Sequence, residues 1–256
     1  MINLFNSNQE QEDDLYYYSI NKIISDDILI YHHLGLGDAI ICNGFINHIS
    51  KKFKTIYLIV DQKMETSIKY LYSKNKKIKL LPVQLSNTND ADDEVMKKGQ
   101  ELNLKPLKIG FSYFPEIRFY KAFYKQLKLP YRYSYSLFYQ PRDNYKEDEL
   151  YKHLIDYYEI KESRYNIVHA QASNKTYDLK ISNNLPTIYV DRESDIFGNM
   201  FYYNKTIENA SEVHCLNSSF SHFVDRIQSK NKLYYHDIRG SKLQLKRNWK
   251  VVNYGN

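Results

Sequence analysis

Residues 27–45 read DILIYHHLGLGDAIICNGF. An apolar run leads into a Gly-Leu-Gly-Asp turn, and the stretch that follows (38–52) places Ile41, Phe45 and Ile49 at helical spacing. A buried strand, a tight glycine turn and an amphipathic helix are the opening unit of an α/β fold with a parallel sheet. These residues therefore predict an α/β protein.

The same alternation of strand-like and helix-like segments continues along the chain. Strand-like runs lie at 27–33, 55–61, 78–83 and 107–114, and helix-like stretches at 38–52, 64–73, 92–102 and 116–127. Pro141 interrupts the pattern, and the helix-like stretch 147–160 follows it. A second series then has strands at 165–169, 187–191, 212–216 and 232–235, with helices at 205–210 and 219–228. We therefore predict four units, an acidic extension (1–26), a first domain (27–140), a linker with a helix (141–163) and a second domain (164–256).

Charge is distributed unevenly over the 256 residues. The formal net charge is +6, but six acidic residues and only Lys22 precede Ile28, so the remainder carries +11. Such an excess favours anionic partners, and phosphorylated small molecules, nucleic acid and anionic membrane surfaces all stay open. Hydrophobic residues make up 43% and charged residues 26%, which excludes a wholly disordered or fibrous chain.

No segment of the sequence is typical of secretion or of membrane insertion. The amino terminus carries acidic residues where a secretory signal has a basic start and a continuous apolar stretch. The longest apolar runs, such as 56–60, are far shorter than the ~18 residues that span a bilayer. Cys42 and Cys215 show no CxxC pattern, which is typical of reduced, buried thiols. We expect a cytoplasmic protein without a transmembrane segment, and peripheral contact with a membrane stays open.

The Gly-Leu-Gly-Asp turn is the first candidate for binding chemistry. Gly35 and Gly37 would let the backbone approach a ligand closely, and the amino terminus of the following helix would offer N–H donors to an anion. Asp38 has two interpretations, because an acid at this end of a helix is also a common capping residue. The turn lacks the third glycine of the GxGxxG pattern, so NAD binding is disfavoured.

A second strand, turn and helix lies at 212–227, EVHCLNSSFSHFVDRI. The apolar residues of this helix form one stripe, and His222 points nearly opposite to it. Helical side chains lean toward the amino terminus, so the imidazole would lie over the N–H groups of Ser218, Ser219 and Phe220 and complete a phosphate cradle. The alternative is an N-capping Asn or Ser beside a solvent-exposed histidine.

Other polar residues follow the strands of the second domain. His169 ends one strand, Ser173 and Lys175 come shortly after it, and Arg192 follows the next strand. Open α/β sheets bind ligands outside the carboxyl ends of their strands, so these residues are candidate ligand contacts, with solvated loop residues as the alternative. No HxxxH or CxxC arrangement is present, and the acids at 90–94 lie in a polar stretch that is more typical of a solvated loop, so we expect no metal site.

Two short motifs carry a resemblance to a known family. GDAIICNG (37–44) and NSSFSH (217–222) resemble the GDxxxxxP and DTGxxH signatures of the ADP-heptose lipopolysaccharide heptosyltransferases, which belong to the GT-B class of glycosyltransferases. The motifs lie in the same order and at a similar separation, and the layout matches from residue 27 to about residue 238. The resemblance implies two Rossmann-like lobes facing across a cleft, the second one short. A nucleotide-sugar would be held mainly by the carboxyl-terminal lobe and the acceptor approached from the amino-terminal lobe.

The resemblance also assigns roles to single residues. Asp38 would be the general base that deprotonates the acceptor hydroxyl, and His222 with the N–H groups of Ser218 and Ser219 would hold the donor diphosphate. The sequence departs from the family at three positions: Gly44 replaces Pro, Asn217 replaces Asp and Ser219 replaces Gly.

The function expected from these observations is transfer of a sugar from a nucleotide-sugar donor to a hydroxyl of a glycan or glycolipid. Inversion at the sugar, without a metal or a cofactor other than the donor, is expected. The cradle (217–222), His169 and cations such as Lys175 or Arg192 would stabilise the leaving diphosphate. No nucleic acid is expected as a partner.

Two other classes of protein stay open. A Rossmann methyltransferase would bind S-adenosylmethionine at the glycine turn and its ribose at Asp61, which ends the second strand, but would leave 217–222 without a role. A non-catalytic glycan-binding or nucleic-acid-binding protein would use the positive charge. Tyr131, Tyr133 and Tyr135 alternate as in a strand and would then stack on single-stranded bases.

Overall fold

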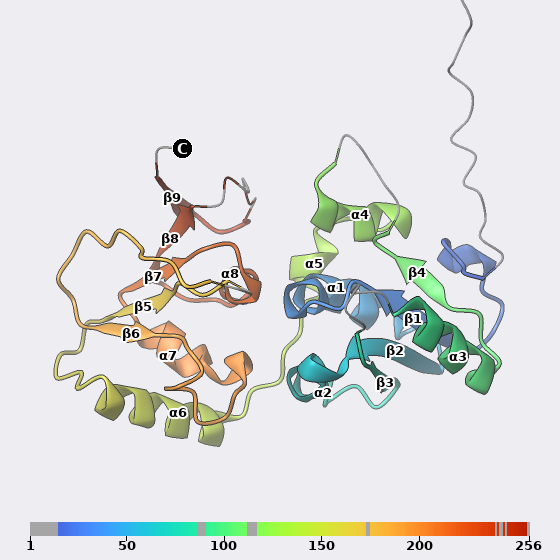
Figure 1. Ribbon diagram of the computed structural model, residues 1–256, viewed down its shortest axis with the longest axis horizontal. Helices are drawn as coiled ribbons and strands as arrows, with labels where there is room; N and C mark the ends of the chain where they lie inside the picture. The colour runs from blue at the N-terminus through green and yellow to red at the C-terminus, as the bar shows by residue number, and fades with distance from the viewer. Residues whose placement is uncertain are drawn as a thin grey trace, which may run out of the picture.

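The computed structural model describes residues 15–85, 91–111, 117–172, 175–238, 240, 243 and 245–254. They form two α/β lobes that lie side by side, each built on one parallel sheet (Figure 1). The chain passes from the first lobe to the second between α5 (Tyr133–Ser136) and α6 (Asn144–Tyr157). The predicted architecture of two α/β lobes is confirmed.

The amino-terminal lobe contains a four-stranded parallel sheet in the order β3-β2-β1-β4. Its strands are β1 (Asp27–His32), β2 (Thr55–Asp61), β3 (Ile78–Val83) and β4 (Leu107–Ile109). Side chains of a strand alternate between faces, so β1 buries Ile28 and Ile30 in one apolar cluster and Leu29 and Tyr31 in another. Burial on both faces explains why the strands of this sheet are near-continuous apolar runs.

Helices cover both faces of this sheet. They are η1 (Ile20–Lys22), α1 (Leu36–Ile49), η2 (Gln62–Met64), α2 (Glu65–Leu71), α3 (Asp92–Leu102), α4 (Phe119–Gln126) and α5. The apolar residues of α1 join the cluster of Ile28, and Val95 of α3 joins that of Leu29. The prediction of a strand with alternating tyrosines was wrong, because Tyr133 and Tyr135 lie in α5.

The carboxyl-terminal lobe contains a five-stranded parallel sheet in the order β6-β5-β7-β8-β9. Its strands are β5 (Asn166–His169), β6 (Thr187–Tyr189), β7 (Glu212–Cys215), β8 (Lys232–Asp237) and β9 (Trp249–Asn253). Its helices are α6, η3 (Met200–Tyr202), α7 (Asn204–Asn209) and α8 (Ser219–Val224). The sequence predicted four of these strands and missed β9, a short edge strand that carries two polar residues among five.

Ion pairs attach α6 to the second lobe. Arg142, just before α6, donates from Nε to Glu147 at 2.6 Å and from Nη1 to Glu208 of α7 at 2.7 Å. Lys205 of α7 lies 2.5 Å from Asp148 of α6. The helix that we placed in a linker therefore packs beneath the carboxyl-terminal sheet, as Figure 1 shows.

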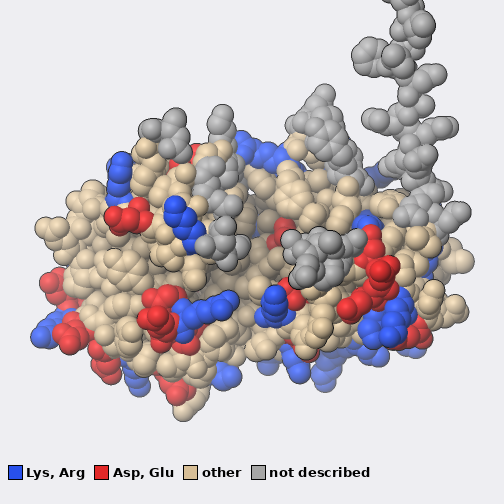
Figure 2. Space-filling model, in the orientation of Figure 1, with Lys and Arg blue, Asp and Glu red and all other residues tan. Residues whose placement is uncertain are grey.

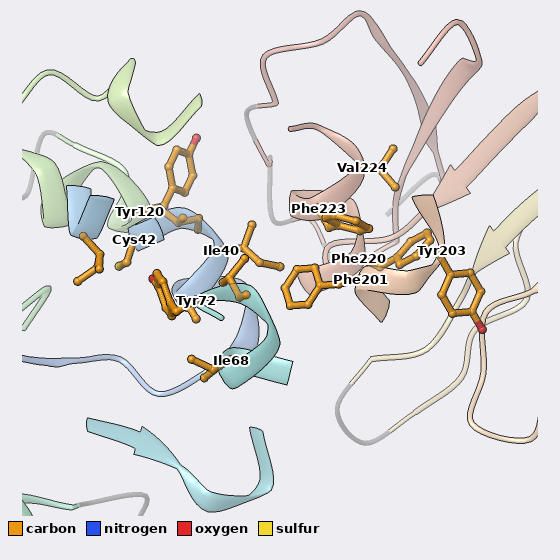
Figure 3. Packing of buried hydrophobic residues seen from close by; sticks show 14 of the residues in the cluster. Ile40, Cys42, Ile68, Tyr72, Tyr120, Phe201, Tyr203, Phe220, Phe223 and Val224 are labelled. Carbon is orange, nitrogen blue, oxygen red and sulfur yellow. The ribbon is translucent and has the colours of Figure 1, made fainter. Parts of the chain in front are cut away.

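One apolar core runs through both lobes. Ile40 of α1 and Ile68 of α2 belong to the same buried cluster as Phe201 of η3 and Phe223 of α8. Figure 3 shows Ile40 and Phe201 pointing toward one another across the junction. Interfaces between domains of one chain are ordinarily more polar, and large apolar ones restrict relative motion. The two lobes are therefore packed as one body.

Polar contacts from the two residues that follow α8 join the lobes as well. Arg226 donates from Nε to the carbonyl oxygen of Ser134 at 2.9 Å, and its guanidinium lies 4.5 Å from the centre of the Tyr135 ring. The Tyr135 hydroxyl donates to Asp225 at 2.9 Å. The short helix α5 is thus held between α1 and α8.

Gly44 explains one departure from the heptosyltransferase signature. A Cβ atom added at Gly44 would lie 2.0 Å from the carbonyl oxygen of Tyr133 and 3.0 Å from the Cα atom of Ser134. Both are backbone atoms of α5, which cannot rotate away as a side-chain end can. The proline of the family signature would not fit here, because α5 packs directly on the α1 backbone.

Other sequence-based expectations concern thiols, charge and membranes. Cys42 and Cys215 are buried and unbridged, and burial raises the pKa of both thiols. Figure 2 shows basic and acidic side chains interspersed over the face drawn there. Among the described residues, no helix combines the length and the apolar character needed to cross a bilayer.

Candidate functional site

A cavity of about 450 Å³ lies where the lobes meet. We call it the inter-lobe cavity. Its walls come from the first turns of α1, the start of α4, and the β7–α8 turn with the start of α8. Its lining residues are Gly37, Asp38, Ile41, Arg118, Phe119, Tyr120, Asn217, Ser218, Ser219, His222 and Leu243. A Cβ atom added at Gly37 would lie 3.5 Å from His222 Cδ2 and 3.6 Å from Ser219 Cα. The two motifs singled out in the sequence therefore meet face to face.

Asp38 is the third residue of α1, which begins at Leu36 after the N-cap residue Gly35. We had expected the helix to begin at Asp38 itself. A Cβ atom added at Gly35 would lie 2.7 Å from Asp38 Oδ2, so the carboxylate folds back over the first turn of its own helix. Burial raises the pKa of Asp38 to about 6, although hydrogen bonds from the N–H groups of Gly35 and Asp38 act in the opposite direction. A carboxyl group with such a pKa suits proton transfer near neutrality.

Ser218 is the N-cap residue of α8. Its hydroxyl accepts from the N–H of Ser221, and the Ser221 hydroxyl accepts from the N–H of Ser218 at 3.2 Å, which completes a capping box. The Ser218 hydroxyl also lies 3.2 Å from Nδ1 of His169, whose ring stacks on Phe220. The N–H of Ser218 is therefore engaged inside the protein, whereas we had expected it to contact a ligand. His169 is not a lining residue of the cavity; it contacts the lining residue Ser218 instead.

His222 lies on the wall of the inter-lobe cavity and is half-buried. Burial, together with the nearby charge of Arg226, lowers the pKa of His222 to about 3. The imidazole is therefore neutral at physiological pH and can donate one hydrogen bond. The alternative interpretation is confirmed in its N-capping serine, Ser218, and wrong in its solvent-exposed histidine.

Arg118 is a lining residue that the sequence did not reveal. It directly precedes α4 as its N-cap residue and brings a guanidinium group to the inter-lobe cavity. Guanidinium groups bind phosphate in a bidentate way. The only signal in the sequence is that arginine is much less frequent than lysine in this chain, so each arginine stands out.

Two other candidates, Lys175 and Arg192, are not among the described lining residues. Lys175 is exposed, with its Nζ 5.0 Å from the centre of the Tyr177 ring, and Arg192 is exposed in the turn after β6. Ser173 lies outside the described residues. Donor binding by these residues stays a prediction.

A second, smaller cavity of about 250 Å³ lies in the amino-terminal lobe. We call it the N-lobe cavity. Its lining residues are Tyr31, His33, Leu34, Gly35, Asp38, Asp61, Met64, Leu85 and Phe111. His32, the last residue of β1, is buried at 1% exposure, and His33, which follows it, lines this cavity. Asp38 lines both cavities and lies where they meet.

Within the described parts of the chain, no three His, Cys, Asp or Glu side chains gather in a way that could hold a metal ion. The described groups that could act on a ligand in these two cavities are carboxylates, a guanidinium, two imidazoles, the amide of Asn217, hydroxyls and backbone N–H groups. This set can bind an anion in one cavity and accept a proton at the boundary with the other.

Comparison with known proteins identifies a class of fold. A solved structure described as a glycosyl transferase family 9 protein from Veillonella parvula DSM 2008 is similar, with a TM-score of 0.54 and 10% sequence identity. The similarity covers 90% of this chain and 88% of that chain. No family model and no curated protein matches the sequence. The fold is therefore that of a two-lobed, GT-B-like α/β protein.

Proposed function

We propose that this protein is a glycosyltransferase that moves a sugar from a nucleotide-sugar to a hydroxyl group of a glycan, with inversion at the sugar and without a metal. The observation that carries the proposal is the position of Asp38, a half-buried carboxylate that lines both cavities. A base at such a boundary can serve an acceptor on one side and a donor on the other.

The reaction proposed is a single displacement. Asp38 takes the proton of the acceptor hydroxyl, the oxygen forms a bond with the anomeric carbon, and the bond from that carbon to the diphosphate breaks. Arg118, His222 and the N–H groups at the start of α8 offset the charge that develops on the diphosphate. The carboxylate and the leaving group act from opposite sides, which inverts the anomeric carbon.

The rate should depend on pH through Asp38. A base must be unprotonated to act, so kcat/KM is expected to fall as pH drops through about 6, by about tenfold per pH unit below it. The ordinary pKa of an aspartate would place this limb near 3.8. A pH–rate profile of the parent protein measures the limb, and a limb near 4, or none, would argue against Asp38 as the base.

Two substitutions of Ser219, one charged and one neutral, test whether the donor diphosphate binds beside this residue. Ser219→Glu places a carboxylate at the proposed diphosphate site, and Ser219→Gln places an uncharged group of the same size there. A thermal-shift panel of UDP, GDP, ADP and CDP should stabilise the parent by ~2.7 kcal/mol at 100 times the dissociation constant. We expect Ser219→Glu to lose this stabilisation and Ser219→Gln to retain most of it, because like charges repel by several kcal/mol. Equal binding to the parent and to Ser219→Glu would place the diphosphate elsewhere.

One observation favours the methyltransferase alternative. Gly35 and Asp61 line the same N-lobe cavity, as binding of S-adenosylmethionine would require. This alternative gives no role to Arg118 and His222 on the inter-lobe cavity. Adding S-adenosylmethionine to the same thermal-shift panel separates the two classes, because a glycosyltransferase should respond to nucleotides and not to this cofactor.

A further inference from the structure

The walls of the N-lobe cavity carry negative charge. Asp38 and Asp61 line it, and its other described lining residues are apolar, aromatic or glycine apart from His33. Burial lowers the pKa of His33, so its imidazole is neutral at physiological pH. The stretches 1–14, 86–90 and 112–116, which lie outside the described residues, contain neither Lys nor Arg.

Lys108 does not line this cavity but packs against two of its aromatic lining residues, Tyr31 and Phe111. Its Nζ is 4.7 Å from the centre of the Phe111 ring and 2.8 Å from Asp92 Oδ2. The ion pair with Asp92 offsets the ammonium charge of Lys108. Positive charge is instead found in the inter-lobe cavity, at Arg118.

Asp61 has a carboxylate oxygen available to a ligand. The residue ends β2 and is 7% exposed, and one oxygen accepts from the N–H of Lys63 at 3.0 Å. The described structure contains no other hydrogen bond to this carboxylate. An ionised carboxylate has several acceptor positions and no donor, so the remaining oxygen fits a hydroxyl or an ammonium group and repels an anion.

Phe111 and His33 give the N-lobe cavity a flat aromatic surface. Phe111 is 39% exposed, and its ring stacks on His33 at 4.3 Å with an interplanar angle of 13°. A sugar ring has an apolar face of C–H groups and an edge of hydroxyls, which matches an aromatic surface beside carboxylates. The volume of about 250 Å³ is below the ~300 Å³ lower limit of typical drug-sized sites, which suits one sugar ring better than a nucleoside cofactor.

We infer that the acceptor sugar in the N-lobe cavity is uncharged or carries an amino group, that acceptors with a phosphate or carboxylate on that ring are rejected, and that Asp61 is the residue that selects between them. This inference rests on the proposed function, because it takes the N-lobe cavity as the acceptor side of Asp38. Rejection follows from repulsion between like charges at a desolvated site.

The test measures binding of matched sugars to the full chain. Methyl glucoside, methyl glucosaminide, methyl glucuronide and glucose 6-phosphate are titrated while the ring resonances of His33, assigned with His33→Gln, are followed by NMR. The neutral and amino sugars should bind at least about tenfold more tightly than the two anionic sugars. In Asp61→Asn this preference should shrink to about threefold or less, because the amide keeps the turn but removes the charge.

Asp191→Asn is the matched control. Asp191 follows β6 in the other lobe, and its carboxylate likewise accepts from the N–H two residues later, at 3.0 Å from Glu193. This variant should keep the full preference. Equal binding of neutral and anionic sugars to the parent, an unchanged preference in Asp61→Asn, or no response of His33 to any sugar would each overturn the inference.

The outcomes separate this inference from the proposed function. If nucleoside diphosphates stabilise the parent but not Ser219→Glu, while anionic sugars bind the N-lobe cavity as well as neutral ones, only the acceptor selection fails. If S-adenosylmethionine displaces the sugars from His33 and no nucleoside diphosphate binds, both fail.

Discussion

Asp38→Asn should reduce sugar transfer by ~100- to 10,000-fold, the usual effect of removing a general base. The amide cannot take the acceptor proton. The change is nearly isosteric, and an amide oxygen can still accept from the N–H of Gly35, so α1 should begin at the same residue. We therefore expect near-parental melting and nucleotide binding, together with the loss of turnover in a radiolabelled or coupled transfer assay.

Asp143→Asn provides the control for this experiment. Asp143 is the N-cap residue of α6, where its side chain accepts from the N–H of Lys146 at 3.1 Å, and it lines neither cavity. Asn caps helices about as well as Asp, so activity should be unchanged. If Asp38→Asn binds nucleotide and transfers sugar at the parental rate, Asp38 is a structural residue of the first helical turn and the proposed mechanism is wrong.

Asp225→Ala should destabilise the protein by ~3–5 kcal/mol, a large part of the ~5–15 kcal/mol that holds a typical protein folded. Asp225 is 2% exposed, directly after α8. Its carboxylate accepts four hydrogen bonds, each of 2.9 Å, from the Tyr135 hydroxyl, the N–H groups of Lys246 and Arg247, and Trp249 Nε1. Removing it leaves buried donors unpaired, which costs more than the bonds themselves contribute.

Urea unfolding measures this effect, and Tyr135→Phe is the matched comparison. That variant removes one of the four donors and keeps the ring under Arg226, so it should cost about 1 kcal/mol. The difference in unfolding free energy between the two variants measures how much stability depends on the remaining three donors. These donors connect the carboxyl-terminal segment to the end of α8. A loss below 1 kcal/mol for Asp225→Ala would mean that the segment is held by its apolar contacts instead.

Features of the fold and of the candidate site could be predicted from the sequence where the residues that determine them are close together in the chain. The two strand–turn–helix units that carry Asp38 and His222 could be predicted, because glycines, hydroxyl residues and apolar spacing mark such units within about fifteen residues. Their meeting in one cavity was expected from the family resemblance. Burial of both sheet faces likewise follows from continuous apolar runs.

Features that depend on distant contacts could not be predicted. Arg118 belongs to no motif, and its place on the cavity depends on how α4 packs beside α1. The tyrosines around Tyr133 alternate as in a strand, yet they fold into α5 because the bare backbone at Gly44 accepts a helix there. The strand β9 has weak apolar character of its own and is formed by pairing with β8.

The core shared by Ile40, Phe201 and Phe223 also affects how this protein can change by mutation. In an enzyme whose lobes hinge freely, fold stability and the alignment of two substrates can drift independently, because different residues govern them. Here the same apolar side chains hold the chain folded and fix the two halves of the inter-lobe cavity against each other. A substitution that loosens this junction would reduce both the stability of the fold and the alignment of the cavity walls. We therefore expect neutral substitutions mainly at surface positions away from the α1–α8 contact.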